Sequence, residues 1–257
     1  MHPARVALAF LTRVPAAEAP ASPTDPWPGL ARATGYYPLA GVLVGGISLL
    51  GCTVGSLLVS PAVGAPLGLA AAYWATRGFH LDGLSDCFDG LLCNGSAERR
   101  LAVMRDPHVG GLGAASITLW ILVRVAVLAA TADTGSTIAA LWFATILARA
   151  PLAFELHLGP AASPGRGLYG QLHPLIGRAD VLRSWLLAAA LAAPAAILAP
   201  LPALVGLLAA ALTTALWHHT WRRSVGGLTG DILGAGVELR ELVLMAAFAM
   251  PLLSPRG

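Results

Sequence analysis

Residues 112–130 read LGAASITLWILVRVAVLAA, an apolar run that holds one charged side chain, Arg124. A helix needs about 20 predominantly apolar residues to cross a bilayer, and this run has that length. The whole chain has the same character, because 56% of its 257 residues are hydrophobic, only 11% are charged, and the mean hydropathy is +0.72. Soluble domains hold about 25% charged residues. The composition therefore predicts an all-α fold, a polytopic transmembrane helical bundle that forms a single integral membrane domain over residues 1–257.

Further apolar runs predict about six to seven spans in this bundle. A span near 241–253 is short, so it is expected either to cross fully or to enter as a tilted or re-entrant piece. Residues 1–36 are expected to lie at the membrane interface, since the apolar run VALAFL is too short for a cleaved signal peptide. The predicted spans are 37–59, 62–77, 112–131, 136–153, 182–200, 202–217 and 241–253.

The arginines fall mainly on one side of this layout. The segments 1–36, 78–111, 154–181 and 218–240 share one side, whereas the connections near 60, 132 and 201 hold no arginine. Arginine-rich short loops stay in the cytoplasm, so the N-terminus and the long polar loops are predicted to be cytoplasmic, in a cell inner or plasma membrane. Arg256 at the tail is the exception. The arginines of the predicted cytoplasmic side are Arg5, Arg13, Arg32, Arg99, Arg100, Arg105, Arg166, Arg178, Arg222, Arg223 and Arg240.

Arg124 stands in the middle of its predicted span, where an arginine costs about 2.5–3.5 kcal/mol even on the lenient insertion scale. Two interpretations remain open at this stage. The side chain either snorkels or faces the bundle and bonds a carbonyl, or it is the partner of a substrate or an acidic residue.

Acidic residues gather in the stretch GFHLDGLSDCFDG, residues 78–90. On a helix, the offsets between Asp82, Asp86 and Asp89 place the three carboxylates within about 60° of one another. Like charges at this spacing repel, and carboxylate oxygens suit Mg²⁺, which also accepts phosphate oxygens as ligands. The stretch therefore predicts a divalent metal site for a phosphorylated substrate. The alternative is a solvated helix face at the membrane edge.

Other polar patches lie on the same predicted side. The segment 98–113 brings Arg105 and Asp106, the glycine-rich segment 223–239 brings Gly230 and Asp231, and the N-terminal segment brings Arg13. Arginines and exposed backbone amides both suit phosphate oxygens, so these patches with the aspartates describe a phosphoryl-transfer site. A nucleic-acid partner is not expected, because no arginine-rich run with interleaved aromatic residues occurs.

These segments resemble the cobalamin (5′-phosphate) synthase, or adenosylcobinamide-GDP ribazoletransferase, family over nearly the whole chain. The resemblance rests on FLTRVP (10–15), YYPLAGVLVGG (36–46), GFHLDGLSDCFDG (78–90), MRDPHVGGLGA (104–114) and GGLTGDILGAGVELRE (226–241). Two departures from the usual family pattern fall in one motif, where position 105 is Arg in place of a frequent Lys and position 108 is His in place of a frequent Arg or Lys.

The resemblance implies a membrane enzyme that joins adenosylcobinamide-GDP to α-ribazole or its 5′-phosphate and releases GMP, with Mg²⁺. It implies a metal and diphosphate site at Asp82, Asp86 and Asp89. His80 or an aspartate is a candidate general base, although a His80 that simply bonds a carbonyl or Asp82 is equally compatible with the sequence. The other matched residues are expected to contact substrate, namely Arg13, Arg105, Asp106, Gly230 and Asp231.

Two other functions share some of these features. A CDP-alcohol phosphotransferase would need an Ala-Arg pair and further acids after Gly90, and these are absent from the sequence. A transporter would use the aspartates as a cation path, but transport carboxylates usually lie near the bilayer midplane. The expected partners are therefore the two substrates and the lipid bilayer, and a homo-oligomer is compatible with the sequence.

Overall fold

The computed structural model describes residues 2–15, 26–131 and 134–250. Within these ranges the chain is helical apart from its connections and one isolated bridge between Ala161 and Leu228, so the predicted all-α class is confirmed. The helices are α1 (Pro3–Leu11), α2 (Trp27–Ala33), η1 (Thr34–Tyr36), α3 (Tyr37–Leu58), α4 (Pro61–Thr76), α5 (Phe79–Leu92), α6 (Ala97–Val103), α7 (Gly111–Ala129), α8 (Thr134–Leu147), α9 (Pro151–Leu158), α10 (Gly167–Leu172), η2 (His173–Leu175), α11 (Arg178–Leu198), α12 (Pro200–Val225) and α13 (Gly230–Ala249).

Five helical segments of the described chain are long and apolar enough to cross a membrane, by length and composition alone. They overlap the predicted spans 37–59, 112–131, 136–153, 182–200 and 202–217. The predicted span 62–77 corresponds to α4, whose 16 residues are fewer than the roughly 20 that a perpendicular span needs. The five segments are Trp27–Leu58, Gly111–Ala129, Gly135–Leu158, Arg178–Leu198 and Pro200–Val225.

The C-terminal part of the chain differs from its prediction. Residues 218–240 were expected to form a cytoplasmic loop, but α12 continues to Val225 and α13 begins at Gly230. The predicted span 241–253 is the second half of α13, and residues 251–253 lie outside the described residues. Arg240, assigned above to the cytoplasmic side, is a 1% exposed residue of the interior. Hydropathy misses this helix because its charged side chains lower the average, although they are paired inside the bundle.

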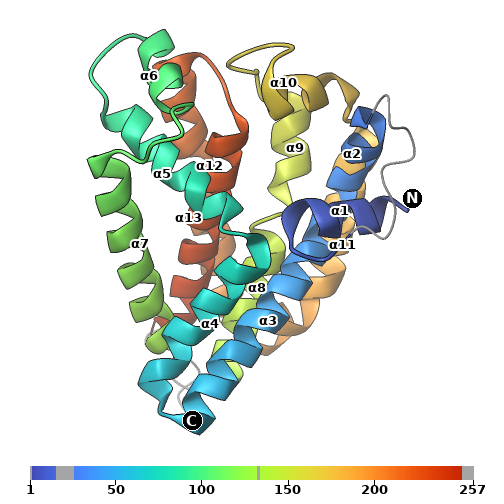
Figure 1. Ribbon diagram of the computed structural model, residues 1–257. Helices are drawn as coiled ribbons and strands as arrows, with labels where there is room; N and C mark the ends of the chain where they lie inside the picture. Colours follow the sequence, from blue (N-terminus) through green and yellow to red (C-terminus); the bar gives the residue numbers. More distant parts are fainter. Residues whose placement is uncertain (1, 16–25, 132–133, 251–257) are drawn as a thin grey trace.

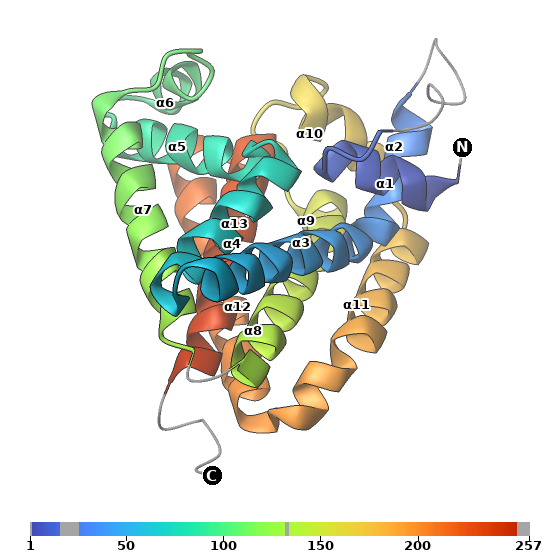
Figure 2. The ribbon, with the colours of Figure 1, turned by 60° about the horizontal axis from the view of Figure 1, so that its bottom comes forward.

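Helix α13 occupies the centre of the bundle and contacts α5, α7, α8 and α12 (Figure 1). Helices α1, α5, α6 and α10 lie toward one end of the molecule, and the turn between α3 and α4 lies at the other. Figure 2 shows α3 and α4 running side by side as a hairpin. The elements that carry the predicted site residues therefore gather at one end of the bundle.

Close approach between helices explains some of the glycines. A Cβ on Gly41 of α3 would lie 2.3 Å from the Thr145 carbonyl oxygen of α8, and one on Gly68 of α4 would lie 2.1 Å from the Cys52 sulfur of α3. Small residues let helix backbones approach one another where little else drives association in a membrane. These contacts hold α3 against both of its neighbours.

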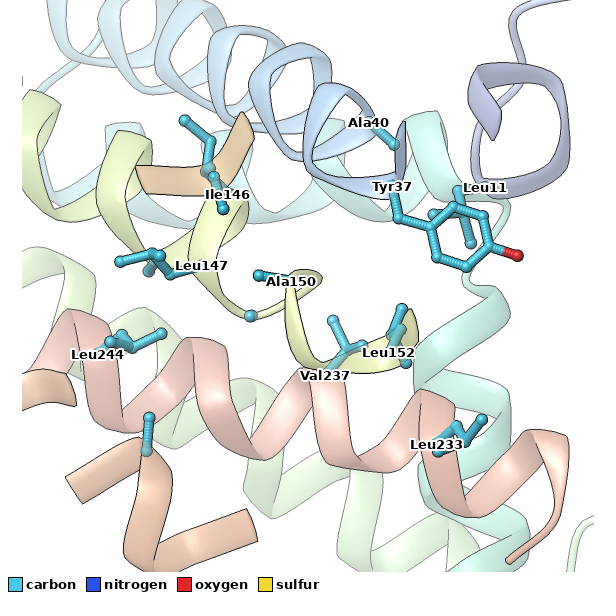
Figure 3. Packing of buried hydrophobic residues seen from close by; sticks show 14 of the residues in the cluster. Leu11, Tyr37, Ala40, Ile146, Leu147, Ala150, Leu152, Leu233, Val237 and Leu244 are labelled. Atoms are coloured by element: carbon cyan, nitrogen blue, oxygen red, sulfur yellow. The ribbon is translucent and has the colours of Figure 1, made fainter. Parts of the chain in front are cut away.

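The apolar core lies between α8, α9 and α13. Figure 3 shows Leu147 and Ala150 on one side of this core and Val237 and Leu244 of α13 on the other. All four side chains are buried, with Ala150 and Val237 fully so. This packing fixes α13 and so also fixes the position of its first turn, which carries Asp231.

A left-handed turn delivers the acidic helix. Arg77 has φ 58° and Gly78 has φ 66°, and the Gly78 amide donates to the Tyr73 carbonyl at 2.9 Å. Arg77 is the one residue other than glycine with positive φ in the described ranges, a conformation that costs roughly 1 kcal/mol. The turn ends α4 and starts α5 in a new direction.

Candidate functional site

Helix α5 carries the three predicted acids, with Asp82 exposed and Asp86 and Asp89 partly buried. It lies outside the five segments suited to crossing a membrane. Gly83 of the same helix lies against α13, since a Cβ there would come within 2.8 Å of the Asp231 carbonyl oxygen. The first turn of α13 thus brings a fourth acid, Asp231, beside the α5 carboxylates.

Repulsion within this group is visible at Asp86. Burial, followed by the carboxylates of Asp82, Asp231 and Asp89, raises the pKa of Asp86 to about 7. None of the four carboxylates forms an ion pair with a basic side chain of the described residues. We refer to Asp82, Asp86, Asp89 and Asp231 as the acidic cluster. The negative charge of the acidic cluster could be neutralised by a bound cation.

The acidic cluster fits Mg²⁺ by the chemistry of its donors, because all of them are carboxylate oxygens and Mg²⁺ prefers such hard ligands. In the described residues, no three His, Cys, Asp or Glu side chains already stand close enough to hold an ion. Mg²⁺ usually takes one or two carboxylates as ligands and completes its shell with water and phosphate oxygens. The separated acids of the cluster can supply those one or two carboxylates. The metal roles of Asp82, Asp86 and Asp89 stay a prediction.

Asp89 has a second role that the sequence did not indicate. Its two carboxylate oxygens accept hydrogen bonds from the backbone amides of Gly110, at 2.8 Å, and Gly113, at 2.7 Å. These amides belong to the start of α7, where unpaired N–H groups and the helix dipole favour a negative charge. Asp89 therefore ties α5 to the N-terminus of α7, and any ligand must share its remaining lone pairs.

Three of the residues expected to contact substrate come together in one cleft. Arg105, Gly230 and Asp231 line a cleft of about 440 Å³, which Arg166 also lines. The Arg105 guanidinium donates to the Ser163 hydroxyl, another residue of the cleft wall, at 2.8 Å. Two arginines and an acid thus line the same cleft.

The structure places Asp106 and Arg13 outside this cleft. Asp106 is more than half exposed and accepts bonds from the backbone amide and the ring of His108, which hold its pKa below the usual range. Arg13 donates from Nε to the Trp74 carbonyl at 2.5 Å and so caps the end of α4. These two side chains are thus engaged in local contacts, and their substrate roles stay predictions.

His80 is 3% exposed, and none of the hydrogen bonds among the described residues involves its ring. The interpretation that His80 bonds a neighbouring carbonyl or Asp82 is therefore wrong. Burial, and then the charge of Arg149, lowers its pKa to about 3. Such a weak proton acceptor is a poor general base near neutral pH.

The largest features that sequence reasoning missed are buried ion pairs. Arg124 pairs with Glu238, and its second nitrogen lies 2.6 Å from Glu241. Glu241 also accepts from Arg149 at 2.6 Å. The acid-partner interpretation of Arg124 is thus confirmed. The available signal was the presence of Arg149, Glu238 and Glu241 within apolar runs, because intramembrane charges require partners.

A second buried group lies nearer the site. Arg240 donates to Glu155 at 2.6 Å, and Glu155 also lies 2.9 Å from His218. His218 of α12 thus joins this pair. Both groups join α13 to other helices, so they hold the helix that supplies Asp231.

Comparisons with known proteins identify the family of the chain. Residues 3–249 match the cobalamin-5-phosphate synthase family. The chain belongs to this family. An adenosylcobinamide-GDP ribazoletransferase from Desulfitobacterium hafniense strain Y51 is 33% identical to it over 97% of either chain. A protein of the same name from Halorubrum lacusprofundi is 35% identical over 95% of either chain. One from Roseiflexus sp. strain RS-1 is 34% identical over 95% of this chain and 88% of its own.

No solved structure matches the chain significantly. The resemblance found in the motifs is confirmed by the family match, and the chain is a transferase of cobalamin biosynthesis. The family match extends from α1 into the last turn of α13, so it includes every residue of the acidic cluster and of the cleft.

Proposed function

We propose that this enzyme transfers the cobinamide phosphoryl group of adenosylcobinamide-GDP to α-ribazole or its 5′-phosphate. A ribose hydroxyl of the acceptor forms a bond to the phosphorus on the cobinamide side of the diphosphate. The bond between that phosphorus and the bridging oxygen breaks, and GMP leaves with the oxygen. The hydroxyl proton passes to a base of the protein and then to solvent. The names of the relatives support both substrates.

The observation that carries this proposal is the juxtaposition of the acidic cluster with an arginine-lined cleft. Asp231 belongs to both. Its charge helps to raise the pKa of Asp86, and its side chain lines the cleft with Arg105 and Arg166. Phosphoryl transfer depends mainly on positioning and on neutralising the charge of the transferred group. Acids that hold a metal beside arginines that bind phosphate oxygens supply both requirements.

We propose Mg²⁺ as the resident cation, held by Asp82, Asp86 and Asp89 with Asp231 beside them. When bound, Mg²⁺ supplies charge neutralisation at the diphosphate. Arg105 and Arg166 of the cleft orient the diphosphate. A carboxylate of the acidic cluster that does not bind the ion accepts the acceptor's hydroxyl proton.

Turnover by the purified enzyme in nonionic detergent tests this reaction. With both substrates and MgCl₂, equal amounts of cobamide and GMP should form, and EDTA should stop both. Asp86→Asn should lower kcat by about 100-fold or more, as expected for loss of a carboxylate that holds the ion and neutralises charge at the diphosphate. Formation of neither product by folded enzyme would exclude the transferase proposal, and movement of a cation across liposomes without chemistry would favour a transporter.

We also propose that the helices cross the inner membrane with the acidic cluster facing the cytoplasm. A Cys93→Ser background removes the one partly exposed cysteine of the described residues. In that background, Asn94→Cys should react with an impermeant thiol reagent from the cytoplasmic side and Ser60→Cys from the opposite side. Both positions follow helix ends, after α5 and before α4. The reverse labelling would invert the proposed orientation.

A further inference from the structure

An open groove of about 670 Å³ lies next to the acidic cluster, between α1, the turn after α4, α5 and the start of α7. Its volume is within the roughly 300–1,000 Å³ of small-molecule sites. Phe10, Phe79 and Val109 form apolar parts of its wall, and Arg77 and Asp82 contribute charged side chains. We refer to this space as the α5–α7 groove. Its mixed wall suits a ligand that carries both an aromatic ring and a negative charge.

The α5–α7 groove and the arginine-lined cleft lie on different sides of α5. Gly83 of this helix faces Asp231 of the cleft. At about 100° per residue, the aspartates of α5 lie about 60–120° around the helix axis from Gly83. Ser85, in the wall of the groove, lies about 160° around the axis in the same direction. The aspartates therefore stand between the two spaces.

Arg77 supplies the positive charge of the groove. Its side chain is exposed, and it forms no ion pair with an acid of the described residues. Its φ of 58° is a conformation that glycine adopts readily and that costs an arginine free energy. The turn itself therefore does not require an arginine, and the guanidinium is available to bind a ligand. Phosphate oxygens are well suited to that donor geometry.

Ser85 gives an independent sign of a ligand. It is 2% exposed, and its hydroxyl has no hydrogen-bond partner among the described residues. The hydroxyl lies close to α7, because a Cβ on Gly113 would come within 2.6 Å of Ser85 Oγ. A buried hydroxyl without a partner costs free energy. A polar atom of a molecule in the groove would supply that partner.

The two spaces match the two substrates of the proposed reaction. The cleft has two arginines, Arg105 and Arg166, which suit a diphosphate. The groove has one arginine and the rings of Phe10 and Phe79, which meet edge-on with centroids 5.8 Å apart. Such rings favour a further aromatic ring as a neighbour. The 5′-phosphate of α-ribazole has one aromatic base and one phosphate.

We propose that the α5–α7 groove binds the acceptor, with the base against Phe10 and Phe79 and the 5′-phosphate on Arg77. This inference rests on the proposed function. The ribose joins the base to the phosphate, so it lies next to Asp82 of the acidic cluster. Displacement at phosphorus needs the attacking and leaving oxygens roughly in line. Substrates held in the two spaces meet that need, because they approach the acidic cluster from different sides of α5.

Kinetics of Arg77→Gly with two acceptors test this assignment. The variant should raise KM for α-ribazole 5′-phosphate about ten-fold or more, as for loss of one hydrogen bond to a charged group. KM for unphosphorylated α-ribazole, KM for adenosylcobinamide-GDP and kcat should change by less than about two-fold. Arg77→Lys keeps the charge and should have a smaller effect. Since glycine favours the φ of this position, Arg77→Gly should stay folded, which the unfolding midpoint checks.

Two other arginines serve as controls. Arg32→Ala removes an exposed arginine that lines neither space and should change no KM. Arg105→Ala should give the opposite pattern to Arg77→Gly, with a raised KM for adenosylcobinamide-GDP and an unchanged KM for either acceptor.

Thiol labelling locates the acceptor without turnover. Val109 lies in the groove wall and is 57% exposed, so Val109→Cys in the Cys93→Ser background should react with an impermeant thiol reagent. With MgCl₂ and one substrate at a time, α-ribazole 5′-phosphate should slow this reaction several-fold, and adenosylcobinamide-GDP should not. Asn94→Cys is the control, because Asn94 is exposed and lines neither space.

The outcomes separate this inference from the function on which it rests. If wild-type enzyme makes cobamide and GMP while Arg77→Gly raises KM for both acceptors equally, or for neither, the acceptor phosphate does not bind at Arg77 and the function stands. Labelling of Val109→Cys that is slowed by the donor alone, or by neither substrate, overturns the assignment in the same way. If folded wild type forms no product, the proposed function fails first.

Discussion

Asp86 and Asp89 lie three residues apart on α5, yet asparagine at the two positions should change stability in opposite directions. The Asp89 carboxylate accepts backbone N–H bonds of 2.8 and 2.7 Å from the start of α7. A hydrogen bond to a charged group contributes about 1.5–3 kcal/mol. Asparagine keeps one acceptor oxygen and loses about one such bond, so Asp89→Asn should lower the free energy of unfolding by about 2 kcal/mol.

Asp86→Asn removes a charge that its surroundings disfavour. A carboxyl whose pKa rises on folding, here to about 7, destabilises the fold once pH exceeds its unfolded value, and this cost is complete above pH 7. Because the Asp86 side chain is partly exposed, solvent screening limits the gain in the free energy of unfolding on removing its charge to about 1 kcal/mol. At pH 8 in EDTA, Asp86→Asn should therefore be as stable as wild type or more so.

Denaturant unfolding in nonionic detergent at pH 8 measures both changes, first in EDTA and then in MgCl₂. Mg²⁺ should raise the unfolding midpoint of the wild type, since a ligand that binds only the folded state stabilises it. It should raise the unfolding midpoint of Asp86→Asn much less. Asp106→Asn is the control, because Asp106 is exposed and outside the cleft. A wild-type midpoint for Asp89→Asn together with a lowered one for Asp86→Asn would refute both assignments.

Three further predictions concern the buried charges, the pH dependence and the cleft. Glu241→Gln leaves Arg124 and Arg149 without their shared carboxylate and should lower the free energy of unfolding by about 3 kcal/mol or more; an unchanged unfolding midpoint would contradict this. The Kd for Mg²⁺, followed through the unfolding midpoint, should weaken by up to about ten-fold from pH 7 to pH 6, because protons compete for a carboxylate whose pKa is about 7. A constant Kd would show that Asp86 is not a ligand. Arg105→Ala should raise KM for adenosylcobinamide-GDP by about ten-fold or more, and Arg105→Lys by less, since it keeps the charge; equal KM values for all three enzymes would exclude this residue from the diphosphate site.

The long apolar helices could be predicted from the sequence because hydropathy depends only on local composition. α3, α7, α11 and α12 overlap their predicted spans, and the spacing of Asp82, Asp86 and Asp89 correctly indicated one helix. The extent of α13 could not be found in this way. Its charged residues are tolerated because Arg124, Arg149 and Glu155 approach from distant parts of the chain, and no local average contains that information.

The candidate site was predictable as a set of residues but not as an arrangement. Asp231 lies 142 residues after Asp89 in the sequence, and the packing of α13 against α5, with Gly83 against the first turn of α13, brings it to the acidic cluster. The bonds from Gly110 and Gly113 to Asp89 were equally hidden, because nothing in the local sequence pairs these glycines with an aspartate 21 and 24 residues earlier.

The central position of α13 has a consequence for how the protein is made. Synthesis proceeds from the N-terminus, so Arg124, Arg149 and Glu155 leave the ribosome before the helix that bears Glu238, Arg240 and Glu241. Until that last segment inserts, Arg124 and Arg149 lack the glutamates with which they pair in the folded protein. A chain terminated early, before residue 230, should consequently be cleared by membrane proteases, while one that stops just after residue 249 should persist.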